Sequence, residues 1–206
     1  MNADPLTSIF TSPARAVECP TVADWSPRWR ANAAAHPGSF ERAIAGGADA
    51  DRMAWAFASG YQAALRVLDP TLPDAVIAAL CVTEAEGNHP RAIQTTLAPD
   101  GSGFTLSGEK RWATLGPDGG LFLIVAREFG NAAERPSLKA VRVSTGAPGL
   151  TIDSITPTGF VPEVPHARVR LEDVRVEAAD VLPGGRRRAR HDRLGRVAEA
   201  ADATGR

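Results

Sequence analysis

The clearest periodic pattern in the chain lies between residues 51 and 68 and is that of a helix. Large apolar residues recur there at intervals of four, four, four and three, which places them in one stripe along an α-helix. They are Met53, Phe57, Tyr61, Leu65 and Leu68. Asp49 and Asp51 precede the stripe and suit the positive N-terminal end of a helix, and Pro70 follows just past its end.

Shorter alanine-rich segments around this stripe also favour helices. We predict helices at residues 25–35 and 39–45, with one or two further turns at 73–79. The region 21–79 is therefore expected to be helical. Residues 1–20 mix Pro, Ser, Thr and Ala without a period, and they are expected to form a loose arm.

From residue 80 onward the pattern alternates in the manner of strands. One strand turns at Pro99–Gly101 and returns through FTLSG, which is typical of a hairpin. Further strands are predicted at 121–127, 138–144, 150–155 and 166–176, separated by Gly, Pro and Asn. No helix long enough for a parallel crossover lies between them. We therefore expect an α+β fold, with a short N-terminal helical region followed by an antiparallel β-barrel or sandwich over residues 80–184.

Composition and charge narrow the classes of function. The 206 residues are 44% hydrophobic and 23% charged, as in an ordinary globular protein, and the net charge of −1 argues against nucleic-acid binding. Residues 185–206 depart from this balance because they hold seven arginines and almost no large apolar residue. They are expected to form a solvated, Arg/Ala-rich polar tail.

Several kinds of chemistry have no motif in this sequence. Cys19 and Cys81 are far apart, so no disulfide framework is expected and a reducing, cytoplasmic setting is favoured. The four histidines have no metal-ligand spacing, and no metal site is expected. The longest apolar runs are too short to span a bilayer, and the first residues lack the pattern of a signal peptide. Neither a Gly-x-Gly-x-x-Gly nor a Gly-x-Ser-x-Gly sequence occurs.

Two stretches are more informative: LCVTEAEGNHP at residues 80–90 and GEKRWATLG at residues 108–116. LFLIVAR, Pro148–Gly149, a Thr-Gly-Phe turn, LEDVRV and Leu182–Gly184 follow in that order. The ordered set resembles the middle domain of acyl-CoA dehydrogenases. That family shows Thr-Glu, then Gly-x-Lys-x-Trp-x-Thr, a strand ending in Ala-Arg, and later an Asp-Val-Arg-Val segment. The resemblance spans residues 80–184.

The resemblance implies a flavoprotein that uses FAD. In that family the Thr of the Thr-Glu motif and the adjoining backbone contact the pyrimidine edge of the flavin, which corresponds to Cys81, Val82 and Thr83. The family's Trp packs on the isoalloxazine ring and the next Thr but one bonds near N5, which corresponds to Trp112 and Thr114. A flavin needs an apolar wall and hydrogen bonds that set its electron affinity, and Trp-x-Thr on one strand supplies both on one side. The residues alone leave a second interpretation open, in which Trp112 is an ordinary cross-strand aromatic.

Three departures from the family pattern bear on function. Asn88 stands in a loop of changed length where the family places a Ser against the CoA arm, so Asn88 is the candidate substrate-binding residue. Leu115 replaces the usual Asn. The family's C-terminal helical bundle, which carries its catalytic glutamate, has no counterpart, and no catalytic residue is assigned. A homo-oligomer or a partner chain is expected to supply the bundle.

The function implied by the resemblance is FAD-dependent oxidation of the Cα–Cβ bond of an acyl thioester such as an acyl-CoA, incomplete without the partner that brings the base. Two alternatives remain open. One is a truncated, non-catalytic relative that acts as a binding or interaction module. The other is a small-molecule-binding barrel in which Trp112 lines a pocket.

Overall fold

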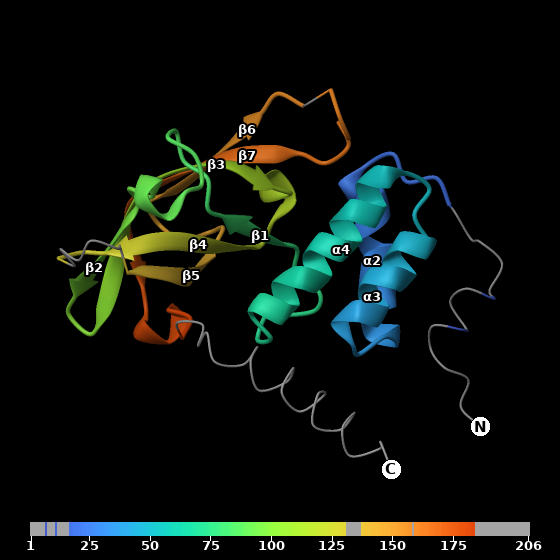
Figure 1. Cartoon of the computed structure of the whole chain (residues 1–206), viewed down its shortest axis with the longest axis horizontal. Coiled ribbons are helices and arrows are strands. Elements are labelled where there is room, and N and C mark those ends of the chain that lie inside the picture. The colour runs from blue at the N-terminus through green and yellow to red at the C-terminus, as the bar shows by residue number, and fades with distance from the viewer. Residues whose placement is uncertain (1–6, 8–10, 12–16, 131–136, 158, 184–206) are drawn as a thin grey trace, which may run out of the picture.

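A layer of helices lies against one end of a curved β-sheet, and α4 lies between the sheet and the other two helices (Figure 1). The computed structural model describes residues 7, 11, 17–130, 137–157 and 159–183. The helices are α2 (Val22–Ala35), α3 (Ser39–Ala48) and α4 (Met53–Leu68). The strands are β1 (Ala78–Cys81), β2 (Thr96–Asp100), β3 (Gly103–Thr114), β4 (Leu121–Glu128), β5 (Leu138–Ser144), β6 (Leu150–Ile155) and β7 (His166–Val176). The predicted polar tail and most of the predicted arm lie outside the described residues.

A capping box makes α2 begin three residues earlier than the sequence pattern predicts. The Asp24 amide donates to the Thr21 hydroxyl, and the Asp24 carboxylate accepts from the Thr21 amide at 3.1 Å. Trp25 and Trp29, four residues apart on α2, lie on one buried face. Trp25 stacks on Trp29 at 5.5 Å between ring centroids and on Trp55 of α4 at 5.4 Å, and this cluster holds the helical layer together.

The apolar stripe predicted along α4 forms, but most of it faces away from the core. Leu65 is buried, whereas Met53, Phe57 and Leu68 are exposed. The buried face consists of Ala54, Trp55, Ala58, Ser59, Gln62, Ala63, Leu65 and Arg66. Small residues on this face let α3 approach so closely that a Cβ added at Gly46 would overlap the Ser59 side chain. Close backbone packing, rather than large side chains, therefore sets the orientation of α4.

The sheet is mixed, which corrects the expectation of a purely antiparallel one. Its strands follow the order β1-β4-β2-β3-β7-β6, and β5 pairs with β4. Four pairings are antiparallel, but β1 and β2 both run parallel to β4. The β2–β3 hairpin itself makes the crossover from β1 to β4, so the lack of a long helix did not exclude parallel pairing. The α+β class is confirmed, and the strands predicted at residues 138–144, 150–155 and 166–176 coincide with β5, β6 and β7.

The free edge of β1 is covered by polar side chains of α4. Gln62 Nε2 donates to the Ala78 carbonyl at 2.8 Å, and Gln62 Oε1 accepts from the Ala78 amide at 3.0 Å. One residue earlier, the Tyr61 hydroxyl accepts from the Leu80 amide at 2.7 Å. These bonds replace those of a neighbouring strand. The further helical turns predicted at 73–79 are wrong, because Ala78 is already part of β1.

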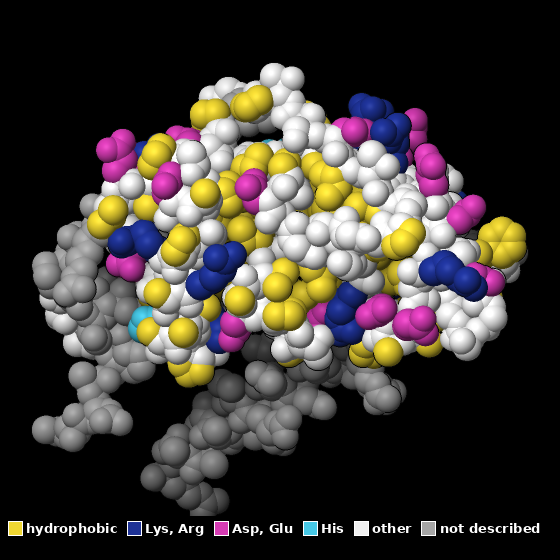
Figure 2. Space-filling view, turned by 180° about the vertical axis from the view of Figure 1, so that it is seen from behind, with side chains coloured by type: hydrophobic (Ala, Val, Ile, Leu, Met, Phe, Trp, Pro, Cys, Tyr) yellow, Lys and Arg dark blue, Asp and Glu magenta, His cyan; other side chains and the backbone are white. Residues whose placement is uncertain are grey.

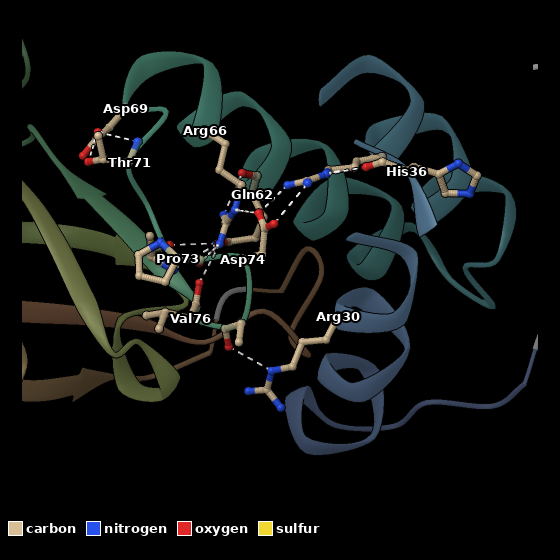
Figure 3. A network of polar contacts seen from close by, with 12 residues as sticks. Arg30, His36, Gln62, Arg66, Asp69, Thr71, Pro73, Asp74 and Val76 are labelled. Carbon is tan, nitrogen blue, oxygen red and sulfur yellow. Dashed lines mark hydrogen bonds and ion pairs between the residues drawn. The ribbon is translucent and has the colours of Figure 1, made fainter. Parts of the chain in front are cut away.

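Arg66 ties the segment between α4 and β1 to the helix (Figure 3). Its guanidinium donates to the carbonyls of Pro73 and Val76 at 2.8 Å each and to Gln62 Oε1 at 3.1 Å. The same group lies over the ring of Trp29, with 5.0 Å from Cζ to the ring centroid. The start of β1 is therefore fixed to the helical layer before the strand enters the sheet.

Among the described residues, none of the helices has the length and apolar content that a transmembrane segment requires.

Candidate functional site

The two informative stretches of the sequence lie side by side in the structure. Thr83 follows β1, and its carbonyl accepts a hydrogen bond from the Arg111 amide of β3 at 2.8 Å. One residue on, the Glu84 carboxylate lies 2.6 Å from Lys110 Nζ. These two contacts bring Thr83 next to the segment of β3 that contains Trp112.

A bulge in β3 turns Trp112 outward. The register between β3 and β7 shifts between Lys110 and Ala113, both of which are fully buried on the inner side of the sheet. Trp112 has a φ of 59°, in the left-handed region, and 48% of it is exposed. Its ring meets His166 edge-on, at 6.0 Å between the centroids. The indole therefore presents an uncovered face to solvent at the end of β3.

Thr114 lies on the same outer side as Trp112, because buried Ala113 separates them on the strand. It pairs with His166 of β7, where partial burial lowers the pKa of the imidazole. Within the described part of the chain, the hydroxyls of Thr83 and Thr114 and the indole N–H of Trp112 have no hydrogen-bond partner. Two hydroxyls and the N–H of an exposed indole ring are thus free to bind a flat ligand with hydrogen-bonding edges.

A buried polar network lies directly behind this outer surface. Glu84 Oε1 accepts from Lys110 Nζ at 2.6 Å and from the Thr95 hydroxyl at 2.7 Å, and it also accepts from the Thr95 amide at 3.0 Å. Glu84 Oε2 accepts from the Gln94 amide at 2.6 Å. Lys110 Nζ donates in addition to the Val82 carbonyl at 3.3 Å. Glu84 and Lys110 are 7% and 0% exposed, so both charges are balanced inside the protein rather than in water.

The carboxylate of Glu84 is held in its ionised form. Burial acts to raise its pKa, but the hydrogen bonds from Lys110, Thr95 and Gln94 outweigh that effect, and the pKa lies below the ordinary value. All of these donors are already engaged with the carboxylate. Glu84 is therefore a structural anion and is unavailable as a base for a ligand on the outer surface.

Cys81 and Val82, the two residues before Thr83, are held in place by burial and by a backbone hydrogen bond. Cys81 is fully buried at the end of β1, and burial raises the pKa of its thiol to about 12, so the thiol is unreactive at neutral pH. The half-buried Val82 uses its carbonyl to accept from Lys110. The structure thus places Cys81, Val82 and Thr83 on one continuous segment beside the bulge.

Asn88 is exposed and lies beyond the tight turn that follows Glu84. Glu84 and Gly87 close this turn with reciprocal backbone hydrogen bonds of 2.9 and 3.1 Å. Gly87 has a φ of 104°, which a residue with a side chain rarely adopts. No contact joins Asn88 to Thr83 or Trp112 among the described residues, so its predicted substrate-binding role remains a prediction.

The leucine that departs from the family pattern has a structural role. Leu115 has a φ of 59° and a ψ of 16°, a left-handed conformation that Asn tolerates better than Leu. Its side chain is fully buried in the cluster formed by Trp25, Trp29 and Trp55. Burial of an apolar side chain offsets the backbone strain at this position.

A loop between β6 and β7 connects the neighbourhood of the site to the helices. Its Pro165 carbonyl accepts from the Leu115 amide at 2.8 Å, and Glu163 pairs with Arg52 at 3.2 Å. Val164 packs into the tryptophan cluster. Figure 2 shows this loop standing above a hollow at the top of the molecule, with hydrophobic side chains gathered on the surface below it. The helical layer and the β-sheet therefore both contribute to the shape of the region beside β3.

Sequence reasoning missed the buried pair and His166. Strand alternation places Lys110 on the same inward face as Leu106, and a lysine at an inward position requires an acidic partner. That signal pointed to a buried anion without naming Glu84. His166 had no detectable signal, because its contact with Trp112 depends on the pairing of β3 with β7. The described residues contain no group of three or more His, Cys, Asp or Glu arranged to hold a metal ion.

Comparisons with known proteins bear on the family and the fold of the chain. The family model described as acyl-CoA dehydrogenase, middle domain, matches residues 79–174. The 3-sulfinopropanoyl-CoA desulfinase of Paraburkholderia xenovorans is 33% identical over 113 residues, which are 54% of this chain and 29% of that protein. The chain therefore spans less than a third of the length of this relative.

Two solved structures share the fold. Butyryl-CoA dehydrogenase from Megasphaera elsdenii has a TM-score of 0.64 at 16% identity, over 78% of this chain and 50% of that one. A glutaryl-CoA dehydrogenase from Mycobacterium smegmatis, solved in complex with FADH2, has a TM-score of 0.57 at 18% identity, over 72% of this chain and 41% of that one. At such identities the likeness shows the arrangement of helices and strands.

Proposed function

We propose that this chain, whose residues 79–174 match the family model for the acyl-CoA dehydrogenase middle domain, holds FAD on the outer surface beside β3. Trp112 supplies the apolar wall for the ring, and Thr83 and Thr114 supply hydrogen bonds at its edge. Cys81 and Val82 form the adjoining backbone. FAD, when bound, supplies the acceptor for a hydride from the Cα–Cβ bond of an acyl thioester.

The observation that carries this proposal is that Thr83 and Thr114 lie on segments that adjoin the exposed indole of Trp112, and that their hydroxyls have no hydrogen-bond partner among the described residues. Thr83 and Trp112 come from segments far apart in the sequence, and the 2.8 Å bond from Arg111 to Thr83 holds them together. Trp112 is 48% exposed although large aromatic side chains are normally buried. A bound ring would cover the indole and give the neighbouring hydroxyls partners.

The residues of this chain bind and orient, and the proton-abstracting base comes from elsewhere. Elimination across the Cα–Cβ bond needs a carboxylate within hydrogen-bond reach of the α-proton. Glu84 is the carboxylate of the motif, and Lys110, Thr95 and Gln94 already engage it. We propose that a partner chain or another copy supplies a helical segment with this base, and that Asn88 contacts the thioester-bearing substrate.

One observation favours a second function, that of a non-catalytic binding module. The only acidic side chain of the two motif stretches that reaches into the described core is Glu84, and it is committed to the ion pair with Lys110. A chain that retains flavin without turning over acyl-CoA in any assembly would have this second function.

The test is the visible absorption spectrum of the purified chain after addition of FAD and desalting. Retained and shifted flavin bands are expected for the wild-type chain, and Trp112→Ala and Thr114→Val are expected to lose them. Phe129→Ala removes another exposed aromatic, at 69% exposure, and Thr151→Val removes an exposed threonine of β6; both controls should retain the bands. A wild-type chain that is colourless after incubation with saturating FAD and desalting would refute the proposal.

A further inference from the structure

The outward face of α4 is apolar along its whole length. Val67 is 69% exposed, Met53 67%, Leu68 51% and Phe57 47%. Ala56, Gly60, Tyr61 and Ala64 complete the same face, which we call the α4 outer face. It carries no charge, because the one charged residue of the helix, Arg66, is buried on the opposite side.

The helix cannot turn to hide this face. Its opposite side is fixed by hydrogen bonds from Gln62 to Ala78 and from Arg66 to the segment before β1. The inner side also carries Trp55, which is 1% exposed and stacks on Trp25. Four large apolar side chains that are each 47% or more exposed on one uncharged helix face mark a candidate site of association.

The arrangement of large and small residues on the α4 outer face is self-complementary. The face runs from Met53 to Leu68, and Gly60 lies at its middle. Reversal of the helix about this middle places Met53 opposite Leu68 and the large Phe57 opposite the small Ala64. Because the face has no charge, the same surface meets itself without like-charge repulsion.

We propose that a second copy of the chain docks on the α4 outer face, with the two α4 helices antiparallel across a two-fold axis between Gly60 and Tyr61. Gly60 lets the two backbones approach because it has no side chain, and a Cβ built there would point into open space. The ring of Phe57 is supported from behind by Tyr61, on which it stacks at 6.0 Å, so it is held ready to fill the space over Ala64 of the other copy.

The expected dimer is reversible. A 16-residue helix is about 24 Å long and roughly 10 Å wide, so its face covers on the order of 240 Å². This is well below the roughly 800 Å² per partner of a stable interface. The interface therefore forms in a concentration-dependent way, and its formation does not depend on flavin.

Sedimentation velocity over a wide range of protein concentrations tests the proposal on the complete chain. Wild-type protein is expected to shift from monomer to dimer as concentration rises. Gly60→Glu places a charge at the centre of the interface without an internal clash, and it should weaken association at least tenfold. Gly47→Glu on α3 is the matched control, because a Cβ at Gly47 also meets no atom within 4 Å, and this variant should associate as the wild type does.

Cross-linking identifies the occupant as a second, antiparallel copy. Gly60→Cys should form an intermolecular disulfide under mild oxidation, since the two copies of this residue adjoin the axis and the native Cys19 and Cys81 are buried. Phe57→Cys should not, because in the antiparallel arrangement the two copies of this residue are about 10 Å apart along the axis, beyond disulfide reach. A chain that stays monomeric at all concentrations overturns the proposal. So does a dimer that Gly60→Glu leaves unchanged, or cross-linking at residue 57 but not at residue 60.

Discussion

Lys110 Nζ lies 2.6 Å from Glu84 Oε1 in the interior of the sheet, and this contact joins the two stretches of sequence that carry the candidate site. The pair is covered on all sides, with 0% and 7% exposure. Its position immediately behind Thr83 and Trp112 means that the outer surface takes its shape from an inner ion pair. The pair therefore couples the stability of the sheet to the shape of the candidate site.

Removal of one partner should cost far more than removal of both. Lys110→Met leaves the Glu84 carboxylate buried without its cation and should lower the free energy of unfolding by about 3–5 kcal/mol. The double variant Lys110→Met/Glu84→Gln should recover much of this loss, because Gln can still accept hydrogen bonds from Thr95. Urea denaturation of the three proteins measures the difference, and equal losses in the single and double variants would contradict this account.

The same pair predicts how stability depends on pH. The folded pKa of Glu84 lies below the unfolded value, which is about 4.3 for Glu. The stability it contributes is therefore fully present above the unfolded pKa and is lost as the pH falls through the folded pKa. Glu84→Gln removes this contribution, so its free energy of unfolding should fall less steeply below about pH 4.3 than that of the wild type. Denaturant titrations from pH 6 to pH 2 measure both slopes, and parallel slopes would show that Glu84 is not held ionised.

At position 115, a glycine variant should be at least as stable as an alanine variant, which is the reverse of the order expected within a helix. Leu115→Ala removes a fully buried side chain from the tryptophan cluster and should cost about 2–5 kcal/mol. Leu115→Gly loses the same contacts but relieves the left-handed backbone, which costs a residue with a Cβ roughly 1 kcal/mol. The glycine variant should therefore melt at or above the temperature of the alanine variant. Ala58→Gly within α4 is the control, and there glycine should be the less stable residue.

Gln62 should stabilise the edge of β1 through both ends of its amide. Gln62→Leu keeps the approximate shape but leaves the Ala78 amide and carbonyl without their partners, at about 1–3 kcal/mol for each buried group. The loss should appear in denaturant unfolding and in faster hydrogen exchange of the Ala78 amide. Gln94→Leu, at an exposed side chain, is the matched control and should change stability by less than about 0.5 kcal/mol. Unchanged exchange at Ala78 in Gln62→Leu would show that β4 alone protects that strand.

The sequence contained enough information to locate the late strands but not to orient the early ones. Residues 150–155 and 166–176 alternate between apolar and polar positions, and that period belongs to the strand itself. Whether β1 runs parallel or antiparallel to β4 depends on where the β2–β3 hairpin carries the chain, and no local period reports this. The apolar stripe on α4 was detected for the same local reason. The sequence pattern did not show that most of this stripe faces away from the core.

The sequence by itself determined most of the helical and strand segments, and its resemblance to a family nominated Thr83, Trp112 and Thr114 for the candidate site. It could do so because side-chain periodicity and ordered motifs are properties of neighbouring residues. Only the tertiary structure decided that Glu84 forms an ion pair with Lys110 and that the His166 ring contacts Trp112. It also decided that α4 exposes most of its large apolar residues. Each of these depends on contacts between segments far apart in the chain, whose geometry is set by strand pairing and close packing rather than by local preference.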